Sequence, residues 1–357
     1  MKTTLSSICD IVAGFAFKGK DFNNNGYPVI KITDIQPPYA DTLNCSHVNL
    51  HNYDTTKLSK YLVCRNDYVI AMTGATIGKI GRITSGHAYI NQRVAKFEIE
   101  NETTKSFVYQ LLLSKGFSTH ISRNIDSQSA QPNISSNSIG RFEFDLPSIE
   151  EQRHIVDILG SIDSSVENKE LQVSKIVELA VNFIALGNNL DTELKPFIKF
   201  IKGKKPQETG TTKAAYLSID AITSFQYENV YSDGTVTCSQ FDVLMVMDGA
   251  SSGTVFSHQS GVVSSTLAKI ECRKEINDYL YWFLLSLKDT IKTRNTGSAI
   301  PHANKDYISS LTFDYNFATN ASNATFLHSL RSKIVSMQEE IVKLRELKAL
   351  YLKKFFG

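Results

Sequence analysis

Apolar residues recur every three or four positions in two long stretches of the chain. The first stretch starts at Ser148 and Glu151, which form the Ser-x-x-Glu pattern of a capping box, and ends near Gly187. Lys169 is its one polar interruption. Its apolar positions are Ile155, Leu159, Ile162, Val166, Val173, Ile176, Ala180 and Phe183. Steps of four and three predict one long helix with a single apolar stripe over 148–187.

A second helix with the same pattern is predicted over 323–357. We expect Asn323 to cap it, and Lys348 interrupts its stripe. Its apolar positions are Leu327, Leu330, Ile334, Met337, Ile341, Leu344, Tyr351 and Phe355. Neither helix can bury its stripe alone, so we expect an antiparallel coiled coil of roughly 50–60 Å. The alternative is that each helix packs on the core of its own domain.

The predicted pairing residues are Ile155, Leu159, Ile162, Val166 and Ile176 on the first helix, and Leu330, Ile334, Met337, Ile341 and Leu344 on the second.

The regions before the two helices repeat one plan. A slide of 175 residues places Gly74, in "VIAMTGATIGKI" (69–80), on Gly249, in "LMVMDGASSGTV" (244–255). Both are an apolar strand followed by a Gly-x-x-x-Gly turn. A slide of 169 places "SQSAQPN" (127–133) on "TGSAIPH" (296–302). We therefore predict an α+β protein in pseudo-two-fold repeat, with mixed domains over 1–147 and 188–322 separated by the helices 148–187 and 323–357.

Composition indicates a soluble cytoplasmic protein. The chain has 357 residues, 42% of them hydrophobic, and a formal net charge of +2, so any basic surface must be local. It has no run of 18 apolar residues. Its five cysteines are far apart and have no metal-spaced histidines, which favours a reducing compartment without disulfides or zinc.

Two related but different domains on a rigid spacer suit a DNA-binding protein. Two-fold DNA readers place their heads about one helical turn apart, roughly 34–36 Å. Divergent loops on a shared framework would let each domain read different bases.

Several segments resemble the DNA-specificity subunit of type I restriction–modification systems, and the resemblance extends over the whole chain. The second half keeps the Gly249–Gly253 turn and the 297–301 loop but lacks a counterpart of "LPSIEEQ". The segments are "GFAFKGKDF" (14–22), "GYPVIKITDIQ" (26–36), "NDYVIAMTGATIGKIGRI" (66–83), "INQRVAKFE" (90–98), "SQSAQPNIS" (127–135) and "LPSIEEQRHIVDIL" (146–159).

The resemblance implies a non-catalytic subunit. Two target recognition domains would each read half of a split double-stranded DNA target, and two methyltransferase subunits would dock on the helices and domains. S-adenosylmethionine and adenine N6 methylation would belong to those partners, and a translocase–nuclease subunit can join the complex. A specificity subunit for a fused restriction–methylation enzyme is a variant of this reading.

Two motifs suggest chemistry that we reject. "QPPY" (36–39) is similar to the Asp/Asn-Pro-Pro-Tyr/Phe loop of adenine methyltransferases, but Gln36 is a poor first residue, so a turn is predicted. "GATIGK" (74–79) is one residue short of a P-loop, so we predict a strand-to-strand turn with positive φ at Gly74 and Gly78. The rival functions are a methyltransferase that uses Gln36 and a scaffold without a DNA role.

DNA contacts need Lys, Arg and backbone N–H groups at phosphates, and planar amides, Arg or hydroxyls at base edges. The segment 194–205 stands out because it carries five lysines and no acid. The candidates in the first domain are Lys18, Lys20, Gly74, Thr76, Lys79, Arg82, Arg93, Arg123, Asn124, Ser127, Gln128, Gln131 and Asn133. Those in the second are Lys202, Lys204, Lys205, Ser251, Lys292, Arg294, Asn295, Thr296, Ser298, His302 and Asn304.

Overall fold

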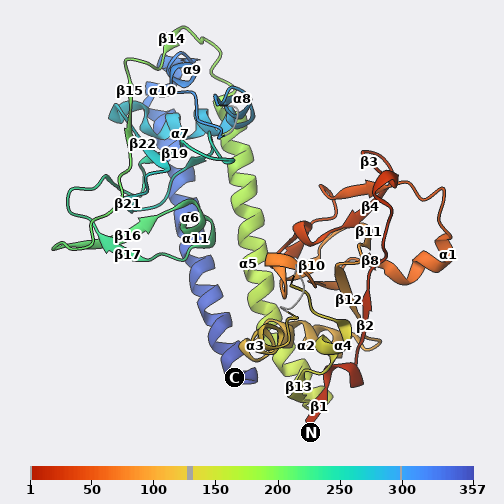
Figure 1. Ribbon diagram of the computed structural model, residues 1–357. Helices are drawn as coiled ribbons and strands as arrows, with labels where there is room; N and C mark the ends of the chain where they lie inside the picture. The colour runs from red at the N-terminus through yellow and green to blue at the C-terminus, as the bar shows by residue number, and fades with distance from the viewer. Residues whose placement is uncertain (1, 127–131, 298–299) are drawn as a thin grey trace. The chain divides into compact units, whose positions relative to one another are not determined.

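The computed structural model describes residues 2–126, 132–297 and 300–357, and the chain folds into two compact units (Figure 1). Unit 1 consists of Met1–Ser164 and Arg345–Gly357, and unit 2 of Ser165–Leu344. Each long helix therefore contributes one segment to each unit. Among the described residues, no helix is long and apolar enough to cross a membrane.

The described residues of unit 1 form two large sheets and a separate strand pair. The larger has the strand order β2-β12-β9-β10-β6-β5, and the other has the order β3-β7-β4-β11-β8. Strands β1 and β13 pair separately, with Thr3 opposite Phe144. The strands are β1 (Lys2–Thr4), β2 (Asp10–Ala13), β3 (Phe22–Asn23), β4 (Tyr27–Ile30), β5 (Ile35–Gln36), β6 (Tyr39–Ala40), β7 (Ser46–Val48), β8 (Leu62–Cys64), β9 (Tyr68–Ala71), β10 (Ile80–Ile83), β11 (His87–Ile90), β12 (Val94–Glu98) and β13 (Glu143–Asp145).

Strand β9 is buried on both faces, as its uninterrupted apolar sequence predicts for a central strand. Helices cover the larger sheet and start at side-chain caps. Asn101 Oδ1 accepts the Thr104 amide at 3.0 Å, and Ser114 Oγ accepts the Phe117 amide at 3.2 Å. The helices that precede the first long helix are α1 (Thr55–Leu58), α2 (Glu102–Leu112), α3 (Lys115–Arg123) and α4 (Ser136–Gly140).

Unit 2 contains sheets with corresponding strand orders, β15-β22-β19-β20 and β17-β16-β21-β18, and the separate pair β14 and β23. The strands are β14 (Thr192–Glu193), β15 (Ile198–Lys202), β16 (Lys213–Leu217), β17 (Asn229–Tyr231), β18 (Thr237–Cys238), β19 (Val243–Val246), β20 (Val255–Phe256), β21 (Gly261–Val263), β22 (Leu267–Cys272) and β23 (Thr312–Phe313). The shorter helices are α6 (Ile219–Ser224), α7 (Asn277–Ser286), α8 (Lys288–Thr293), α9 (Lys305–Ser309) and α10 (Tyr315–Thr319).

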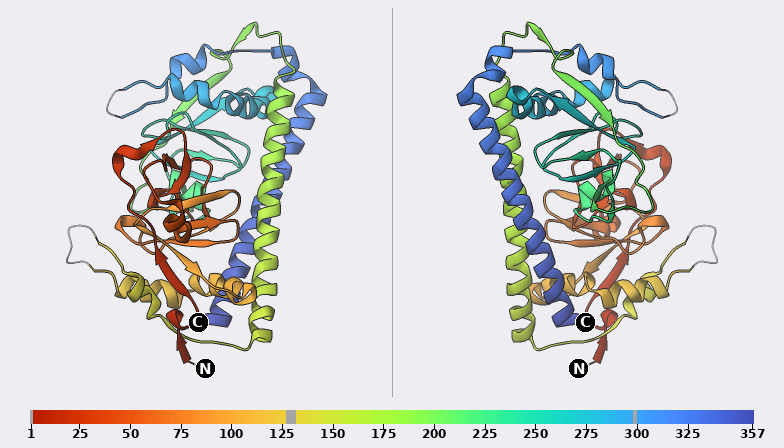
Figure 2. Two further views of the ribbon diagram at one scale, coloured as in Figure 1. Left: turned by 90° about the vertical axis from the view of Figure 1, so that its right-hand side faces the viewer. Right: turned by 90° about the vertical axis from the view of Figure 1, so that its left-hand side faces the viewer.

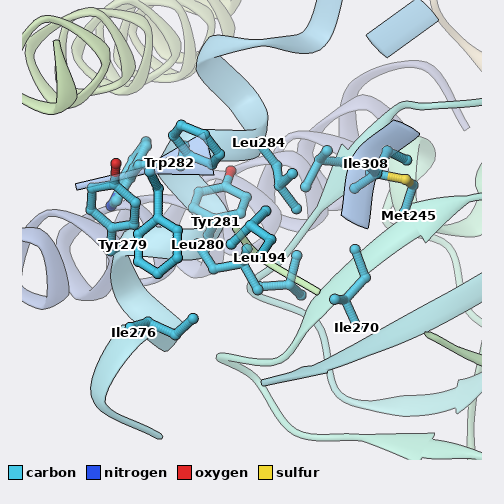
Figure 3. Packing of buried hydrophobic residues seen from close by; sticks show 14 of the residues in the cluster. Leu194, Met245, Ile270, Ile276, Tyr279, Leu280, Tyr281, Trp282, Leu284 and Ile308 are labelled. Atoms are coloured by element: carbon cyan, nitrogen blue, oxygen red, sulfur yellow. The ribbon is translucent and has the colours of Figure 1, made fainter. Parts of the chain in front are cut away.

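The core of unit 2 lies between α7 and the sheet that contains β19 and β22 (Figure 3). Trp282, the one tryptophan of the chain, is fully buried there, and its indole N–H donates to the Leu327 carbonyl oxygen at 3.3 Å. Because Leu327 lies on the second long helix, this bond joins that helix to the domain core.

The first long helix, α5 (Ile149–Ile184), begins where the sequence predicts. The predicted capping box is confirmed, because Glu151 N–H donates to Ser148 Oγ at 3.3 Å and Ser148 N–H donates to Glu151 Oε2 at 2.9 Å. The helix ends three residues before Gly187, whose N–H donates to the Ile184 carbonyl oxygen at 3.1 Å.

The predicted cap of the second long helix is wrong. Helix α11 (Ala321–Phe356) starts after Asn320, whose Oδ1 accepts the amides of Ser322 at 3.0 Å and Asn323 at 3.2 Å. Asn323 lies inside the first turn, and its side-chain amide donates to the Phe317 carbonyl oxygen at 3.0 Å. Helix α10 ends at Thr319, so the one extended residue available for the cap is Asn320.

Apolar side chains of both long helices share the core of each unit. In unit 1, Ile155 and Leu159 of α5 lie in the cluster against which Tyr351 and Phe355 of α11 pack, and Figure 2 shows these helix ends side by side. In unit 2, Ile176 of α5 and Leu330 and Ile334 of α11 pack in one cluster. Val166 and Leu344 are half-buried, and Ile162, Met337 and Ile341 are buried. Each stripe therefore serves both the facing helix and the domain core.

The lysines that interrupt the two stripes are paired with carboxylates on the facing helix. In unit 2, Lys169 of α5 forms an ion pair with Glu340 of α11. In unit 1, Lys348 of α11 donates to Asp163 of α5 at 2.6 Å, and Asp163 also accepts the Gln110 side-chain amide at 2.8 Å. Within each unit the charge of the interrupting lysine is thus offset by an anion on the facing helix segment.

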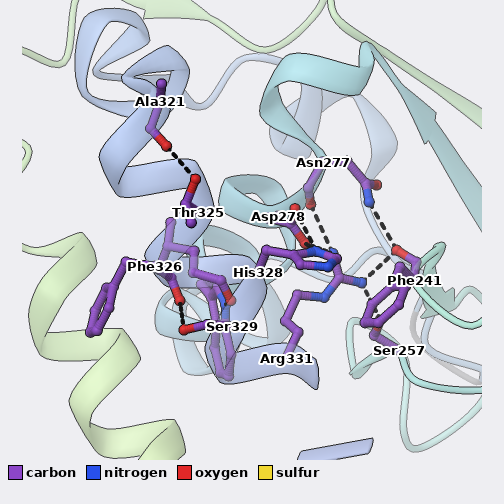
Figure 4. A network of polar contacts seen from close by, with 12 residues as sticks. Phe241, Ser257, Asn277, Asp278, Ala321, Thr325, Phe326, His328, Ser329 and Arg331 are labelled. Carbon is purple, nitrogen blue, oxygen red and sulfur yellow. Dashed lines mark hydrogen bonds and ion pairs between the residues drawn. The ribbon is translucent and has the colours of Figure 1, made fainter. Parts of the chain in front are cut away.

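A buried arginine attaches α11 to the body of unit 2 (Figure 4). Arg331 is fully buried, and its Nη1 donates to Asp278 Oδ1 at 2.9 Å and to the Asn277 carbonyl oxygen at 3.3 Å. Its Nη2 donates to the Phe241 carbonyl oxygen and to Ser257 Oγ. The guanidinium therefore fixes the loop before β19 and the start of α7 to the helix.

His258 beside this network makes the stability of unit 2 depend on pH. Its burial, with the nearby Arg331 charge, lowers the pKa of His258 to about 3, against roughly 6.5 in an unfolded chain. Between these values the unfolded chain binds more protons, so this stability is complete above about pH 6.5 and is lost as the pH falls toward 3, by up to about 1.4 kcal/mol per pH unit.

We expect the urea midpoint of unit 2, followed by Trp282 fluorescence, to fall between pH 7.5 and pH 5 more steeply in the wild type than in His258→Asn. Asparagine suits this position because residue 258 has a φ of 70°. Equal pH slopes in the two proteins would contradict this role of His258.

Candidate nucleic-acid interface

The candidate interface of unit 1 is built on the glycine turn between β9 and β10. Gly74 and Gly78 have φ values of 72° and 82°, which confirms the predicted strand-to-strand turn. Gly74 N–H donates to the Pro132 carbonyl oxygen at 3.0 Å, and Ile134 N–H donates to the Met72 carbonyl oxygen at 2.9 Å. The turn and the end of the 122–133 segment therefore form one framework.

Unit 2 has the same framework at the positions that the sequence offsets of 175 and 169 residues predict. Gly249 and Gly253 have φ values of 101° and 86°, and Gly249 N–H donates to the Pro301 carbonyl oxygen at 2.9 Å. Ala303 N–H donates to the Met247 carbonyl oxygen at 2.9 Å, as Ile134 does to Met72. The backbone bridge between Thr73 and Asn133 in unit 1 corresponds to that between Asp248 and His302 in unit 2.

Several first-domain candidates meet at this turn. Gly74 and Thr76 lie in it, Lys79 follows it, and the carbonyl oxygen of Arg93 accepts the Met72 amide at 2.9 Å. A Cβ at Gly78 would lie 3.0 Å from Ile121 of α3, the helix that ends at Arg123. Lys79, Arg93 and Arg123 are exposed. Ser127, Gln128 and Gln131 lie outside the described residues.

Two of the second-domain candidates, Lys202 and His302, are joined by Asp248, which the sequence analysis missed. Lys202 Nζ lies 2.7 Å from Asp248 Oδ2, and His302 Nδ1 lies 2.8 Å from Asp248 Oδ1. Partial burial raises the pKa of Asp248, but the hydrogen bonds from Lys202 and His302 outweigh it, and the pKa lies below its ordinary value. The lysine-rich segment 194–205 is thus partly neutralised within the unit.

The other second-domain candidates differ in how many contacts they make within the protein. Asn295 donates from its side chain to the Ser252 carbonyl oxygen at 2.9 Å and has a buried Oδ1, so its amide belongs to the loop framework. Arg294 lies over the Tyr307 ring, 5.7 Å from the centroid, and remains exposed. Ser251 is half-buried in the turn, and Ser298 is outside the residues that the structure describes.

Four lysine candidates lie away from the glycine turns. Lys18 and Lys20 lie at the short 3-10 helix Gly19–Asp21, which directly precedes β3. Lys204 and Lys205 directly follow Gly203 at the end of β15. All four are exposed.

The segments that carry these lysines also expose planar amides that the sequence analysis missed. They are Asn24 and Asn25 in unit 1 and Gln207 in unit 2. The available signal was the run of three asparagines after Asp21-Phe22, which stands between two lysines and a strand.

Both motifs that suggested chemistry form turns in the structure. Pro37 and Pro38 form the connection of a tight hairpin in which Gln36 pairs with Tyr39, which confirms the predicted turn. In the part of the chain that the structure describes, no group of three or more His, Cys, Asp or Glu side chains is placed to hold a metal ion.

Comparison with known proteins defines the class. Residues 1–178 match the family model described as type I restriction modification DNA specificity domain. The chain is 35% identical over 119 residues to the type I restriction enzyme MjaVIII specificity subunit of Methanocaldococcus jannaschii, covering 30% of this chain and 28% of that protein. It is 27% identical over 207 residues to the EcoBI specificity subunit of Escherichia coli, covering 56% and 41%.

The chain belongs to the family of type I restriction–modification specificity subunits. The fold agrees, because the crystal structure of a type I S subunit from M. genitalium superimposes with a TM-score of 0.55 and 15% identity, over all of this chain and 96% of that one. Its family is one of DNA-specificity subunits, not of catalytic ones. The matched segments span less than half of the two curated relatives.

Proposed function

We propose that the chain reads a bipartite double-stranded DNA target, with unit 1 reading one half-site and unit 2 the other. The observation that carries this proposal is the same hydrogen-bonded framework in both units with different side chains on it. Thr73 and Asn133 occupy the positions that Asp248 and His302 occupy in unit 2. A common framework with unlike polar groups suits a pair of unlike half-sites.

The two halves of the chain would form a pseudo-two-fold repeat around a coiled coil. We propose target recognition domains over 1–147 and 188–322, with helical segments over 148–187 and 323–357. The antiparallel contacts of Lys348 with Asp163 and of Lys169 with Glu340 support this pairing. A rigid helical spacer would set the distance between the half-sites, as a dimer interface does in two-fold DNA readers.

DNA binding would combine phosphate and base contacts. Lys79, Arg93 and Arg123 in unit 1 and Arg294 in unit 2 are exposed cations on or near the glycine-turn frameworks, as phosphate contacts require. The N–H groups of the Gly74 and Gly249 turns serve the frameworks themselves, because they bond to Pro132 and Pro301.

The chemistry would belong to partner subunits in the cytoplasm. We propose that two methyltransferase subunits dock on the helices and domains, bind S-adenosylmethionine, and methylate adenine N6 after flipping the base. A translocase–endonuclease subunit would join the same complex to cleave unmodified DNA. The chain itself supplies recognition and carries no catalytic residue in this proposal.

Methylome sequencing tests the proposal in the host with and without this chain. We expect N6-methyladenine in one split motif that disappears with the gene. Exchange of residues 2–145 for the equivalent segment of a relative should change one half of the motif and leave the other. The control is the corresponding exchange in unit 2, which should change the other half of the motif.

Three outcomes would contradict the proposal. Methylation of DNA by the purified chain alone would favour the methyltransferase alternative. An unchanged methylome after deletion would favour a scaffold. A change of both half-sites after the exchange in unit 1 would exclude independent reading by the two units.

A further inference from the structure

We propose that each unit has a second DNA-reading element, in which side-chain amides contact base edges and neighbouring lysines contact phosphates. Amide loop 1 comprises residues 18–27 of unit 1, and amide loop 2 comprises residues 204–212 of unit 2. This inference rests on the proposed function and assigns specificity to residues outside the glycine-turn framework.

The two loops leave their domains at equivalent places. A Cβ added at Gly14 would lie 2.3 Å from the carbonyl oxygens of Ile90 and Asn91, and one at Gly203 would lie 2.1 Å from that of Ser264. Gly14 directly follows β2 and Gly203 directly follows β15, each an edge strand that pairs with β12 or β22. Gly14 contacts the end of β11 and the residue after it, and Gly203 contacts the segment between β21 and β22. Close backbone contact thus fixes the base of each loop at the same point of the fold.

Hydrogen bonds and close backbone contact hold amide loop 1 in one conformation. Tyr53 Oη donates to Asp21 Oδ2 at 2.6 Å and accepts the Lys18 amide at 3.0 Å. The backbone N–H of Asn25 donates to Asn23 Oδ1 at 2.9 Å, which closes an Asx turn at the tip of the loop. Gly26, with a φ of 139°, lies so close to Val48 that a Cβ would be 2.4 Å from its carbonyl oxygen.

Aromatic side chains form the support beneath this loop. Phe17 lies between Phe15, Tyr53 and Tyr89, with ring centroids 5.0–6.1 Å away. Lys31 Nζ lies over the Phe22 ring, 3.9 Å from its centroid. A loop on a packed aromatic cluster loses little conformational entropy when it binds, which is what a specific contact requires.

The groups at the surface of amide loop 1 are left for a ligand. Asn24 and Asn25 are exposed and, in the described structure, their side chains bond to no protein group. Lys18 and Lys20 are exposed and have no ion-pair partner among the described residues. A side-chain amide matches the N6 and N7 edge of adenine in the major groove, and lysines beside it match the phosphates.

Amide loop 2 also carries two lysines and an exposed side-chain amide, and it has a different anchor. Asp233 accepts the Thr211 hydroxyl at 2.6 Å and the Thr211 and Thr212 amides at 2.9 and 3.2 Å. These bonds lower the pKa of Asp233 to about 2 and close the end of the loop. Gln207 is exposed with no hydrogen-bond partner in the described residues, and Lys204 and Lys205 precede it.

The test uses the full chain in complex with its methyltransferase subunits and a library of randomised DNA duplexes. Asn24→Ala/Asn25→Ala should relax base preference at one or more positions of one half-site, by roughly 5- to 150-fold, and leave the other half-site unchanged. Gln207→Ala should relax base preference in the other half-site and leave the first one unchanged. Lys18→Ala/Lys20→Ala should weaken binding to all sequences and reduce the salt slope by about two.

Asn52→Ala, which removes another exposed and unbonded amide of unit 1, is the matched control and should leave the motif unchanged. A wild-type motif at every position for both amide variants would overturn the inference while leaving the proposed function intact. If the wild-type complex selects no motif, the proposed function itself fails.

Discussion

Replacing Arg331 with methionine should destabilise unit 2 by about 3–5 kcal/mol. The substitution removes the guanidinium but leaves Asp278, Ser257 Oγ and the Phe241 carbonyl oxygen around the site it occupied. Removing one partner of a buried ion pair is costly because the other loses its compensation. Urea unfolding followed by the buried Trp282 would measure the loss.

His328→Ala is the matched control for this experiment. His328 lies on the same helix and its Nδ1 lies 3.2 Å from Asp278 Oδ2, but its side chain is 50% exposed. An exposed pair contributes little, so we expect a loss of less than about 1 kcal/mol. A loss in Arg331→Met no larger than that of His328→Ala would show that the buried network does not hold α11 on the domain.

Replacing Gly203 with alanine should destabilise unit 2 by about 3 kcal/mol, and Gly14→Ala should affect unit 1 in the same way. The new Cβ would lie 2.1 Å from the Ser264 carbonyl oxygen in one case and 2.3 Å from the Ile90 carbonyl oxygen in the other. These carbonyl oxygens accept the backbone N–H groups of Leu267 and Phe15, so neither can move away without losing a hydrogen bond. Trp282 fluorescence reports unit 2, whereas far-UV circular dichroism reports the secondary structure of both units, so a dichroism transition without a change in Trp282 fluorescence reports unit 1.

Gly160→Ala supplies the control for the intrinsic effect of alanine. Gly160 lies within α5, and a Cβ there would meet nothing within 4 Å. We expect this variant to be more stable by about 0.5–1 kcal/mol, because alanine restricts the unfolded chain. Wild-type stability of Gly203→Ala would mean that the base of amide loop 2 can shift, which would remove the positional argument for that loop.

The amide loops and the glycine-turn frameworks give separate predictions for specificity. The framework positions Asn133 and His302 bridge to Thr73 and Asp248, so a substitution there also changes the shape of a turn. The side chains of Asn24, Asn25 and Gln207 have no hydrogen bond to the described protein, so their substitution tests base contact without removing a bond of the fold. This difference makes the amide variants the sharper test of which residues read DNA.

The sequence by itself determined the long helices, the α5 cap, the glycine turns and the matching positions of the two glycine-turn frameworks. Each of these is encoded in a few neighbouring residues, as in the capping box of Ser148 and Glu151 or the paired glycines at 74 and 78. The error at Asn323 arose where Asn320 offered the same cap within one turn. Only the end of α10 at Thr319 decided between them.

Only the tertiary structure decided which polar groups are already engaged. Asp248 lies 46 residues from Lys202 and 54 from His302 in the sequence, and their pairing depends on strand register. Each long helix is likewise divided between two units, and Lys169 and Lys348 have partners on the other helix. These features depend on contacts between residues that are far apart in the sequence. Such contacts are fixed by global packing, which no local pattern of residue types specifies.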